Sequence, residues 1–206
     1  MDFKNYTLQE FSDITASNSP APGGGSISAM AASYAAALIC MVAKLTIGKK
    51  GYEGVLDIMC DTLNKADKLR KDLLDDIQKD SRSFDGYMLA LKMPKNTDEE
   101  KRLRQRAMQE ALKNASLVPL GVAKKSIEVL KLSKIACEKG NKNTLSDGLV
   151  SAYMARSAAL AAIENVLINI SGIKDESFVA NIKNECEIIQ NRATELENVC
   201  KAEIKL

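Results

Sequence analysis

Three consecutive glycines followed by a serine are the residues whose types and spacing most directly suggest chemistry. Gly23, Gly24, Gly25 and Ser26 follow two prolines and lead into an apolar, alanine-rich segment. Glycines that open a helix offer bare backbone N–H groups, positive φ angles and the positive end of the helix dipole, which suit an anion or a developing negative charge. The alternative is a tight loop in which Ser26 caps the helix. The residues alone favour it, because neither the dinucleotide-binding nor the P-loop pattern is met.

Carboxylates are the main candidates for acid–base catalysis, because the chain contains no histidine. Asp80 and Asp85 are five residues apart on an expected helix, so they project about 140° apart and cannot form a carboxylate pair on one face. We prefer Asp80, which shares its face with Ser83 and Tyr87. Asp147 is a third candidate, although it stands at an expected helix start, where capping alone would explain it.

Two lysines and two asparagines are candidates for holding a ligand. Lys44 lies inside an apolar helix and Lys49 just beyond its end, where either ammonium group suits a substrate carboxylate; a solvated helix end is the alternative. Asn165 and Asn169 lie four residues apart on an otherwise apolar segment. A buried amide without a partner costs about 1–3 kcal/mol, so both should bond to a neighbouring helix or to a ligand ring.

The elements that must position these side chains are helices. Ala, Leu, Ile, Lys and Glu are abundant and aromatic residues make up 4%, which favours an all-α fold with alanine-rich buried central helices. We expect a single domain over residues 1–206, with Pro119 kinking or stopping the fourth helix. Periodicity, capping boxes and glycine or proline breaks predict helices over 8–15, 27–47, 53–91, 98–138, 149–170 and 176–204.

Composition also argues against several classes of protein. The 29 basic and 27 acidic residues leave a net charge of +2, which makes nucleic acid an improbable partner. The uncharged run 27–43 is alanine-rich and short, so we expect a buried core helix rather than a membrane span. The five cysteines are scattered, which argues against a disulfide framework or a zinc site, and no metal site is expected. Without a recognisable secretion signal, the expected location is the cytoplasm.

The segment 20–52, PAPGGGSISAMAASYAAALICMVAKLTIGKKGY, resembles the signature of the formiminotetrahydrofolate cyclodeaminase and methenyltetrahydrofolate cyclohydrolase family. In that family a proline-flanked triple glycine opens an alanine-rich helix that ends in LTIGKK. Four further blocks agree in order: 80–95, 106–120, 140–155 and 164–175. The resemblance covers nearly the whole chain. Tyr34 and Cys40 depart from it, being bulkier than the family's usual residues in this helix.

The resemblance implies an all-helical enzyme of folate one-carbon metabolism that forms a homodimer or larger assembly. Two activities stay open: cyclisation of 5-formiminotetrahydrofolate to 5,10-methenyltetrahydrofolate with release of ammonia, and hydrolysis of the methenyl compound to 10-formyltetrahydrofolate. A tetrahydrofolate derivative would be the substrate, with no metal or redox cofactor. The chain corresponds to the cyclodeaminase part of the bifunctional animal enzymes, without the formiminotransferase domain.

The resemblance also changes the weight of the candidate residues. It favours the ligand-binding interpretation of the glycines and Ser26, and it places Asp80 and Asp85 in a matched block. The lysines would then meet the glutamate tail of the folate and the asparagines its pterin ring. Composition alone does not exclude a non-catalytic oligomeric bundle or a folate-binding protein.

Overall fold

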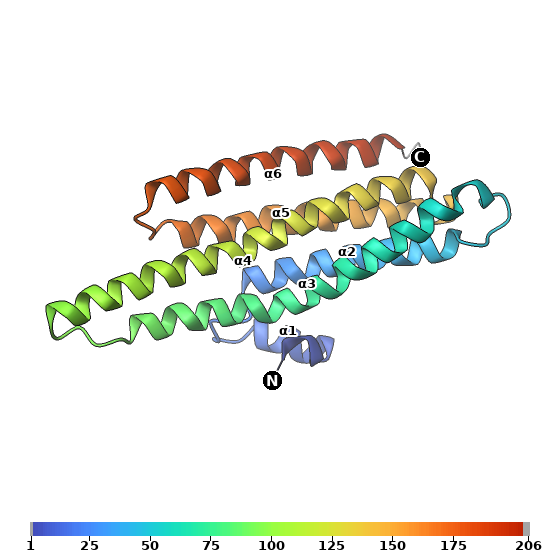
Figure 1. Cartoon of the computed structure of the whole chain (residues 1–206). Helices are drawn as coiled ribbons and strands as arrows, with labels where there is room; N and C mark the ends of the chain where they lie inside the picture. Colours follow the sequence, from blue (N-terminus) through green and yellow to red (C-terminus); the bar gives the residue numbers. More distant parts are fainter. Residues whose placement is uncertain (1, 204–206) are drawn as a thin grey trace.

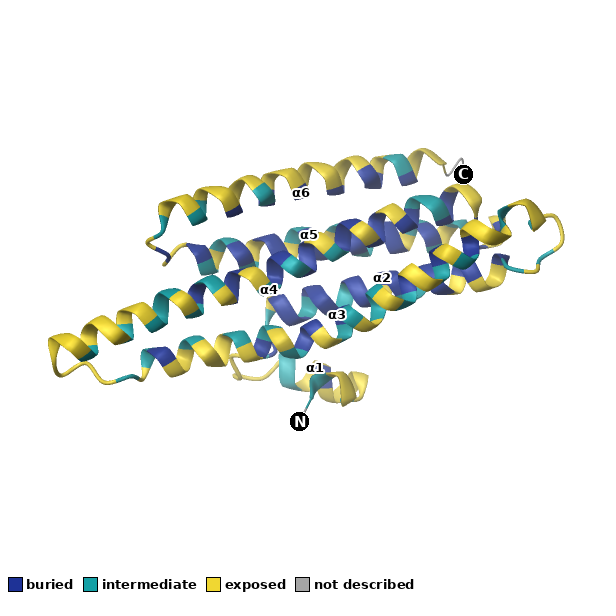
Figure 2. Cartoon of the chain, viewed as in Figure 1, coloured by how far each residue is buried: buried dark blue, intermediate teal, exposed yellow. Residues whose placement is uncertain are grey.

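Two alanine-rich helices form the centre of the molecule. The computed structural model describes residues 2–203, and in it α2 (Gly24–Thr46) and α5 (Leu145–Ile170) lie against each other in the middle of a helical bundle (Figure 1). Small side chains let the two backbones approach closely, and the hydroxyl of Ser151 on α5 donates to the carbonyl of Ala35 on α2 over 2.8 Å. Figure 2 shows that both helices are buried over most of their length. The all-α expectation and the alanine-rich centre are confirmed.

Longer, more polar helices cover this centre. α3 (Leu56–Leu91) and α4 (Asp98–Lys139) run antiparallel, and their joined ends extend as an arm beyond the central pair (Figure 1). α6 (Glu176–Glu203) lies along the outside of α4 and α5, and α1 (Leu8–Thr15) packs near the arm's base. Short 3₁₀ segments occupy Phe3–Asn5, Glu53–Val55 and Lys142–Thr144. Throughout residues 2–203 the backbone forms helices and no strand.

Local capping explains where several helices begin and end. Both expected capping boxes are present: Thr7 with Glu10 opens α1, and Thr97 with Glu100 opens α4. After α2, Gly48 has a φ of 73°, the left-handed conformation that glycine adopts without steric cost.

Pro119 does not stop α4. Of the two outcomes that we expected, a kink or a stop, the stop is therefore wrong. The helix continues from Asp98 to Lys139 with Pro119 inside it. Proline has no N–H, so the carbonyl of Ala115, four residues earlier, loses its helical donor. The side-chain amide of Asn169 on α5 donates to that carbonyl over 2.8 Å, which replaces the missing bond. Tertiary packing therefore compensates for a residue that normally breaks a helix.

Two helix starts also differ from the sequence prediction. α5 begins at Leu145, four residues before the expected start. α2 begins at Gly24 with Gly23 as its N-cap, so Ser26 lies inside the first turn and is not the cap. Gly23, Gly24 and Gly25 do not have positive φ angles: among the described glycines only Gly48 and Gly51 do. The triple glycine therefore serves close approach rather than an unusual backbone conformation.

By length and composition α2 could cross a membrane, and it is the one described helix that passes this test. Of its most apolar stretch, 61% is buried inside the bundle. That burial is typical of a core helix, which satisfies the same length and hydropathy criteria.

Two glycines, one in crowded and one in open surroundings, allow a test of how tightly the bundle is packed. A Cβ on Gly140 would overlap the carbonyl oxygen of Ala136 and lie 2.7 Å from Val42 Cγ1, whereas a Cβ on Gly121, in the middle of α4, meets nothing within 4 Å. We expect Gly140→Ala to lower the free energy of unfolding by about 1–3 kcal/mol through overpacking. Gly121→Ala should raise it by about 0.5–1 kcal/mol through helix propensity. Urea unfolding followed by circular dichroism measures both, and a shift of the same sign in the two variants would contradict this account of the packing.

Candidate functional site

The carboxylate of Asp80 lies directly against the first turn of α2. Asp80 projects from α3, and a Cβ on Gly25 would lie 2.6 Å from the Asp80 carboxyl carbon, so any side chain at position 25 would displace the carboxylate from this position. The Ser26 hydroxyl donates to Asp80 Oδ2 over 2.9 Å, and the Ser26 backbone N–H also donates to this carboxylate. Asp80 therefore acts like an N-cap residue: it accepts a hydrogen bond from a backbone N–H in the first turn of α2, although it lies on the neighbouring helix α3.

Opposing influences set the protonation of Asp80. Burial raises the pKa of the Asp80 carboxyl above its ordinary value, because desolvation disfavours the charged form. The two hydrogen bonds from Ser26 lower the pKa, but they offset only part of the effect of burial. A carboxyl group with a raised pKa is better suited to give and take protons near neutral pH.

Asp80 faces a cavity of about 440 Å³, a size typical of small-molecule sites. The glycine loop, α3, α4 and the last turns of α5 enclose it. Of the described residues that line this cavity, Asp80 alone carries a charge. The lining residues are Pro20, Ala21, Gly23, Gly24, Gly25, Asp80, Ser81, Ser83, Phe84, Tyr87, Leu112, Ala115, Asn165, Ile168, Asn169, Ser171 and Gly172.

Both asparagines reach the cavity, and both amide groups have the partners that their burial requires. Asn165 donates to the carbonyl of Ala161 within α5 over 2.8 Å, and Asn169 donates across to α4 as described above. A Cβ on Gly24 would lie 3.1 Å from Asn165 Nδ2, so the amide packs closely on the glycine loop. Each bond uses one of the two N–H groups of its amide, and no described residue donates to either amide oxygen, so both oxygens remain as acceptors for a ligand that has N–H donors.

The structure therefore brings together Asp80, Asn165, Asn169 and the glycine loop. Ser83 and Tyr87 line the same cavity as Asp80, as their shared helix face predicted. The Ser83 hydroxyl donates to the backbone carbonyl of Asp80, however, and not to its carboxylate.

The other candidates lie elsewhere. Asp85 is exposed and does not line the cavity, in keeping with the preference for Asp80. Asp147 is in the first turn of α5, 18 residues or about 27 Å along the helix from Asn165.

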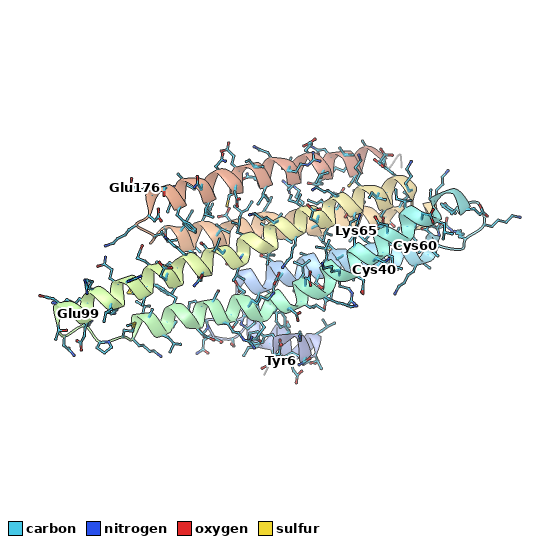
Figure 3. The ribbon with its side chains drawn as sticks, viewed as in Figure 1. Tyr6, Cys40, Cys60, Lys65, Glu99 and Glu176 are labelled. Carbon is cyan, nitrogen blue, oxygen red and sulfur yellow. The ribbon has the colours of Figure 1, made fainter. Side chains whose placement is uncertain are left out.

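Lys44 and Lys49 also lie far from the cavity within this chain. Lys44 is exposed in the last turn of α2, 20 residues or about 30 Å from Gly24. The Lys49 ammonium donates to the buried side chain of Asn141 over 2.7 Å and lies above the ring of Tyr52, which accounts for it structurally. In Figure 3, Cys40, one helical turn before Lys44, lies toward the end of the bundle opposite to Glu99 and Glu176.

Sequence reasoning missed the apolar walls of the cavity. Phe84 lines it from α3, Leu112 from α4 and Ile168 from α5. Ile168 has 69% of its surface exposed and Phe84 36%, values that are high for large apolar side chains in helices. In the sequence they are apolar residues on the polar face of an amphipathic helix. The sequence alone does not distinguish such residues from the apolar side chains that ordinarily occur on protein surfaces.

The described residues contain no group of three or more His, Cys, Asp or Glu side chains arranged to hold a metal ion. The five cysteines are free thiols.

Comparisons with known proteins agree on one relationship. The sequence model of the family described as formiminotransferase-cyclodeaminase matches residues 7–188. A methenyltetrahydrofolate cyclohydrolase of Methylorubrum extorquens is 42% identical over 89% of this chain and 88% of its own length. A formimidoyltransferase-cyclodeaminase of Gallus gallus is 39% identical over 83% of this chain, which spans only 32% of that longer protein.

A solved structure has the same architecture. The crystal structure of formiminotetrahydrofolate cyclodeaminase from Thermotoga maritima superposes with a TM-score of 0.88 and 32% sequence identity. The match covers 97% of this chain and 96% of that one. The helix arrangement described above is therefore shared along nearly all of the described residues.

The raised pKa of Asp80 predicts how stability changes with pH. Because the pKa is higher in the folded than in the unfolded state, folding is penalised once the pH rises through the folded pKa, and the penalty is absent below the unfolded value near 4. Asp80→Asn keeps the shape, and its amide can still bond to Ser26. We therefore expect this variant to melt at or above the wild-type temperature at pH 7, with the difference vanishing toward pH 4.

Thermal unfolding between pH 4 and 8 measures this difference. Asp85→Asn, at an exposed position on the same helix, is the control and should follow the wild type throughout. If Asp80→Asn became progressively less stable than the wild type as the pH rises from 4 to 8, the ionised carboxylate would be stabilising and burial would not dominate its pKa.

Proposed function

Because this chain belongs to the formiminotransferase-cyclodeaminase family, we propose that it is a folate enzyme that makes or opens the one-carbon bridge between N5 and N10 of tetrahydrofolate. A relative named as a cyclohydrolase and relatives named as cyclodeaminases are each similar along most of this chain. The observation that carries the proposal is a single carboxylate with a raised pKa, held against a glycine loop in an otherwise uncharged cavity.

The two candidate reactions have one compound in common, 5,10-methenyltetrahydrofolate, and both require proton transfer. In the cyclodeaminase reaction, N10 of 5-formiminotetrahydrofolate attacks the formimino carbon, and ammonia leaves to give 5,10-methenyltetrahydrofolate. In the cyclohydrolase reaction, water attacks the methenyl carbon, and the C–N5 bond breaks to give 10-formyltetrahydrofolate. Each reaction takes a proton from the attacking atom and gives one to the leaving nitrogen.

Asp80 is placed to serve this exchange. As a carboxylate it stabilises the cationic amidinium carbon and accepts the proton of N10 or water. Once protonated, it donates that proton to ammonia or to N5 as the bond to carbon breaks. Burial favours the neutral form and so makes the donation possible, while Ser26 holds the carboxylate in position. No metal or redox cofactor enters either sequence.

The pterin ring fits the remaining polar groups. Its amide-like edge carries N–H donors, and the amide oxygens of Asn165 and Asn169 line the cavity as acceptors. Phe84 and Tyr87 supply apolar surface for a flat ring. The glycine loop supports this assignment because its backbone lies open to the same cavity.

Turnover of 5,10-methenyltetrahydrofolate tests the function and the role of Asp80 together. We expect purified protein to accelerate loss of the methenyl chromophore, or to release ammonia from 5-formiminotetrahydrofolate, and the two assays separate the activities. Asp80→Asn should lower turnover by about 10²-fold or more, the usual scale for a positioned proton-transfer group, and exposed Asp85→Asn only slightly.

Circular dichroism must show that the helices of both variants persist. Full activity in both variants would remove the carboxylate mechanism from α3 and leave Asp147 as the candidate. No acceleration of either reaction by the wild-type protein would favour a non-catalytic bundle or a folate-binding protein.

We further propose a cytoplasmic homodimer. Large apolar side chains remain exposed along the outer face of α2: Tyr34 at 40%, Met41 at 36% and Leu45 at 50%. They recur at helical spacing, so they form a stripe that a second copy of the chain would cover. Nucleic acid and membrane are not partners in this proposal, given the nearly balanced charge and the burial of α2.

Light scattering at micromolar concentration checks the assembly. We expect twice the mass of one chain, and Leu45→Glu should shift the protein toward the monomer because a charge would have to be desolvated at the interface. Glu substitution at Ile188, which is 59% exposed on α6, is a matched control that should leave the mass unchanged. A monomeric wild-type protein would contradict the proposal.

A further inference from the structure

A second cavity, of about 590 Å³, adjoins the first at the arm of the bundle. Tyr87, Leu112 and Gly172 line both cavities, so the two lie side by side and are together called the groove below. The second cavity lies where the end of α3 and the start of α4 approach the connection between α5 and α6. In Figure 3, Glu99 marks the tip of this arm and Glu176 the start of α6, both at the same end of the molecule.

The two halves of the groove differ sharply in charge. The first half carries the single carboxylate of Asp80. The second is lined by Lys95, Lys101, Arg104 and Lys174, and no acidic residue is among its described lining residues. Lys101 pairs with Asp98 over 2.9 Å, whereas Lys95, Arg104 and Lys174 form no ion pair among the described residues. An anionic ligand would relieve the repulsion among these three cations.

Arg104 is the most fixed of these cations. Its Nε donates to the carbonyl of Leu91 at the end of α3 over 3.1 Å, and its side chain is partly buried. Among the described residues its guanidinium forms no ion pair with a carboxylate, so the terminal N–H groups remain available. A planar guanidinium held by its Nε presents the remaining donors in the geometry that suits a carboxylate.

The distance between the two halves matches a molecule with opposite charges at its ends. Leu91 is 11 residues from Asp80, about 16 Å along α3. A methenyltetrahydrofolate has a cationic one-carbon bridge on its pterin side and carboxylates on its glutamate side, separated by an aromatic ring and an amide.

We propose that this basic cavity binds the glutamate carboxylates of the folate substrate, with Arg104 as the principal contact and Lys95 and Lys174 as supporting charges. The inference rests on the proposed folate chemistry and adds to it the direction in which the substrate lies. The groove places the bridge carbon at Asp80 and the tail toward the arm. Lys44 and Lys49, which the sequence offered for this role, lie at the opposite end of α2.

The test compares two ligands that differ only in the tail. Calorimetric binding and steady-state kinetics are measured with 5,10-methenyltetrahydrofolate and with 5,10-methenyltetrahydropteroate, which lacks the glutamate. We expect the wild type to bind the glutamate form more tightly, and Arg104→Ala to weaken that binding about 10-fold or more with kcat nearly unchanged. The same variant should not change binding of the pteroate form. The preference should also shrink as salt is raised from 0.1 to about 0.5 M.

Matched variants locate the effect. Arg104→Lys should retain part of the preference, because the charge remains while the fork of donors is lost. Lys183→Ala removes an exposed lysine from α6, outside both cavities, and should behave like the wild type. Lys44→Ala tests the competing location at the far end of α2.

Three results would overturn the proposal. The wild type could bind both ligands with equal affinity, or Arg104→Ala could weaken the binding of both ligands to the same extent. The third is that Lys44→Ala loses the preference for the glutamate form while Arg104→Ala retains it. Failure of the proposed function looks different. Tail-dependent binding without turnover of either folate derivative would remove the catalytic role and leave the basic cavity as a binding site.

Discussion

The contact between the Asp80 carboxylate and the first turn of α2 is the constraint on which the rest of the site depends. A helix that begins at glycines has unsatisfied N–H groups and no side chain to cap them, and Asp80 supplies the acceptor from α3. The same contact requires glycine at position 25 and buries the carboxylate enough to raise its pKa. In the proposed mechanism, helix capping and acid–base chemistry thus depend on one interaction, and the capping bonds explain why a carboxylate is tolerated in a cavity with no countercharge. The helix dipole adds partial positive charge at this point.

A comparison with Asp76 shows what the absence of a countercharge achieves. Asp76 lies one turn before Asp80 on α3 and is more deeply buried, with 3% of its surface exposed. It forms ion pairs with Lys125 and with Lys79, the latter at 2.7 Å. These ion pairs give Asp76 a structural role, because the pair with Lys125 joins α3 to α4. Asp80 has only neutral donors, which leaves its proton exchangeable.

Much of this arrangement was predictable from the sequence, for identifiable reasons. Capping boxes at Thr7 and Thr97 and the glycine break after α2 are local signals, and they fixed several boundaries correctly. The 3.6-residue period separated Asp80 from Asp85 without knowledge of the fold. The function of Ser26 was not predictable, because its partner is 54 residues away. The continuity of α4 through Pro119 had the same cause, since the compensating donor, Asn169, lies on another helix. Lys44 was a candidate because it is a charged residue inside an apolar helix, and the length of α2 separates it from the glycines by about 30 Å.

The separation of charges along the groove suits the proton-transfer role proposed for Asp80. A lysine beside Asp80 would hold the carboxylate ionised and suppress its role as a proton donor, because an opposite charge within about 4–6 Å lowers a carboxyl pKa. Cations that attract an anionic substrate must therefore lie beyond that range. At about 16 Å along α3 and across partly solvated space, the attraction of Arg104 for a carboxylate stays local, and its influence on Asp80 is largely screened. The extended arm of α3 and α4 thus provides distance: it keeps the cationic end of the groove on the same rigid helices as Asp80, but far enough away that substrate attraction and proton transfer do not interfere.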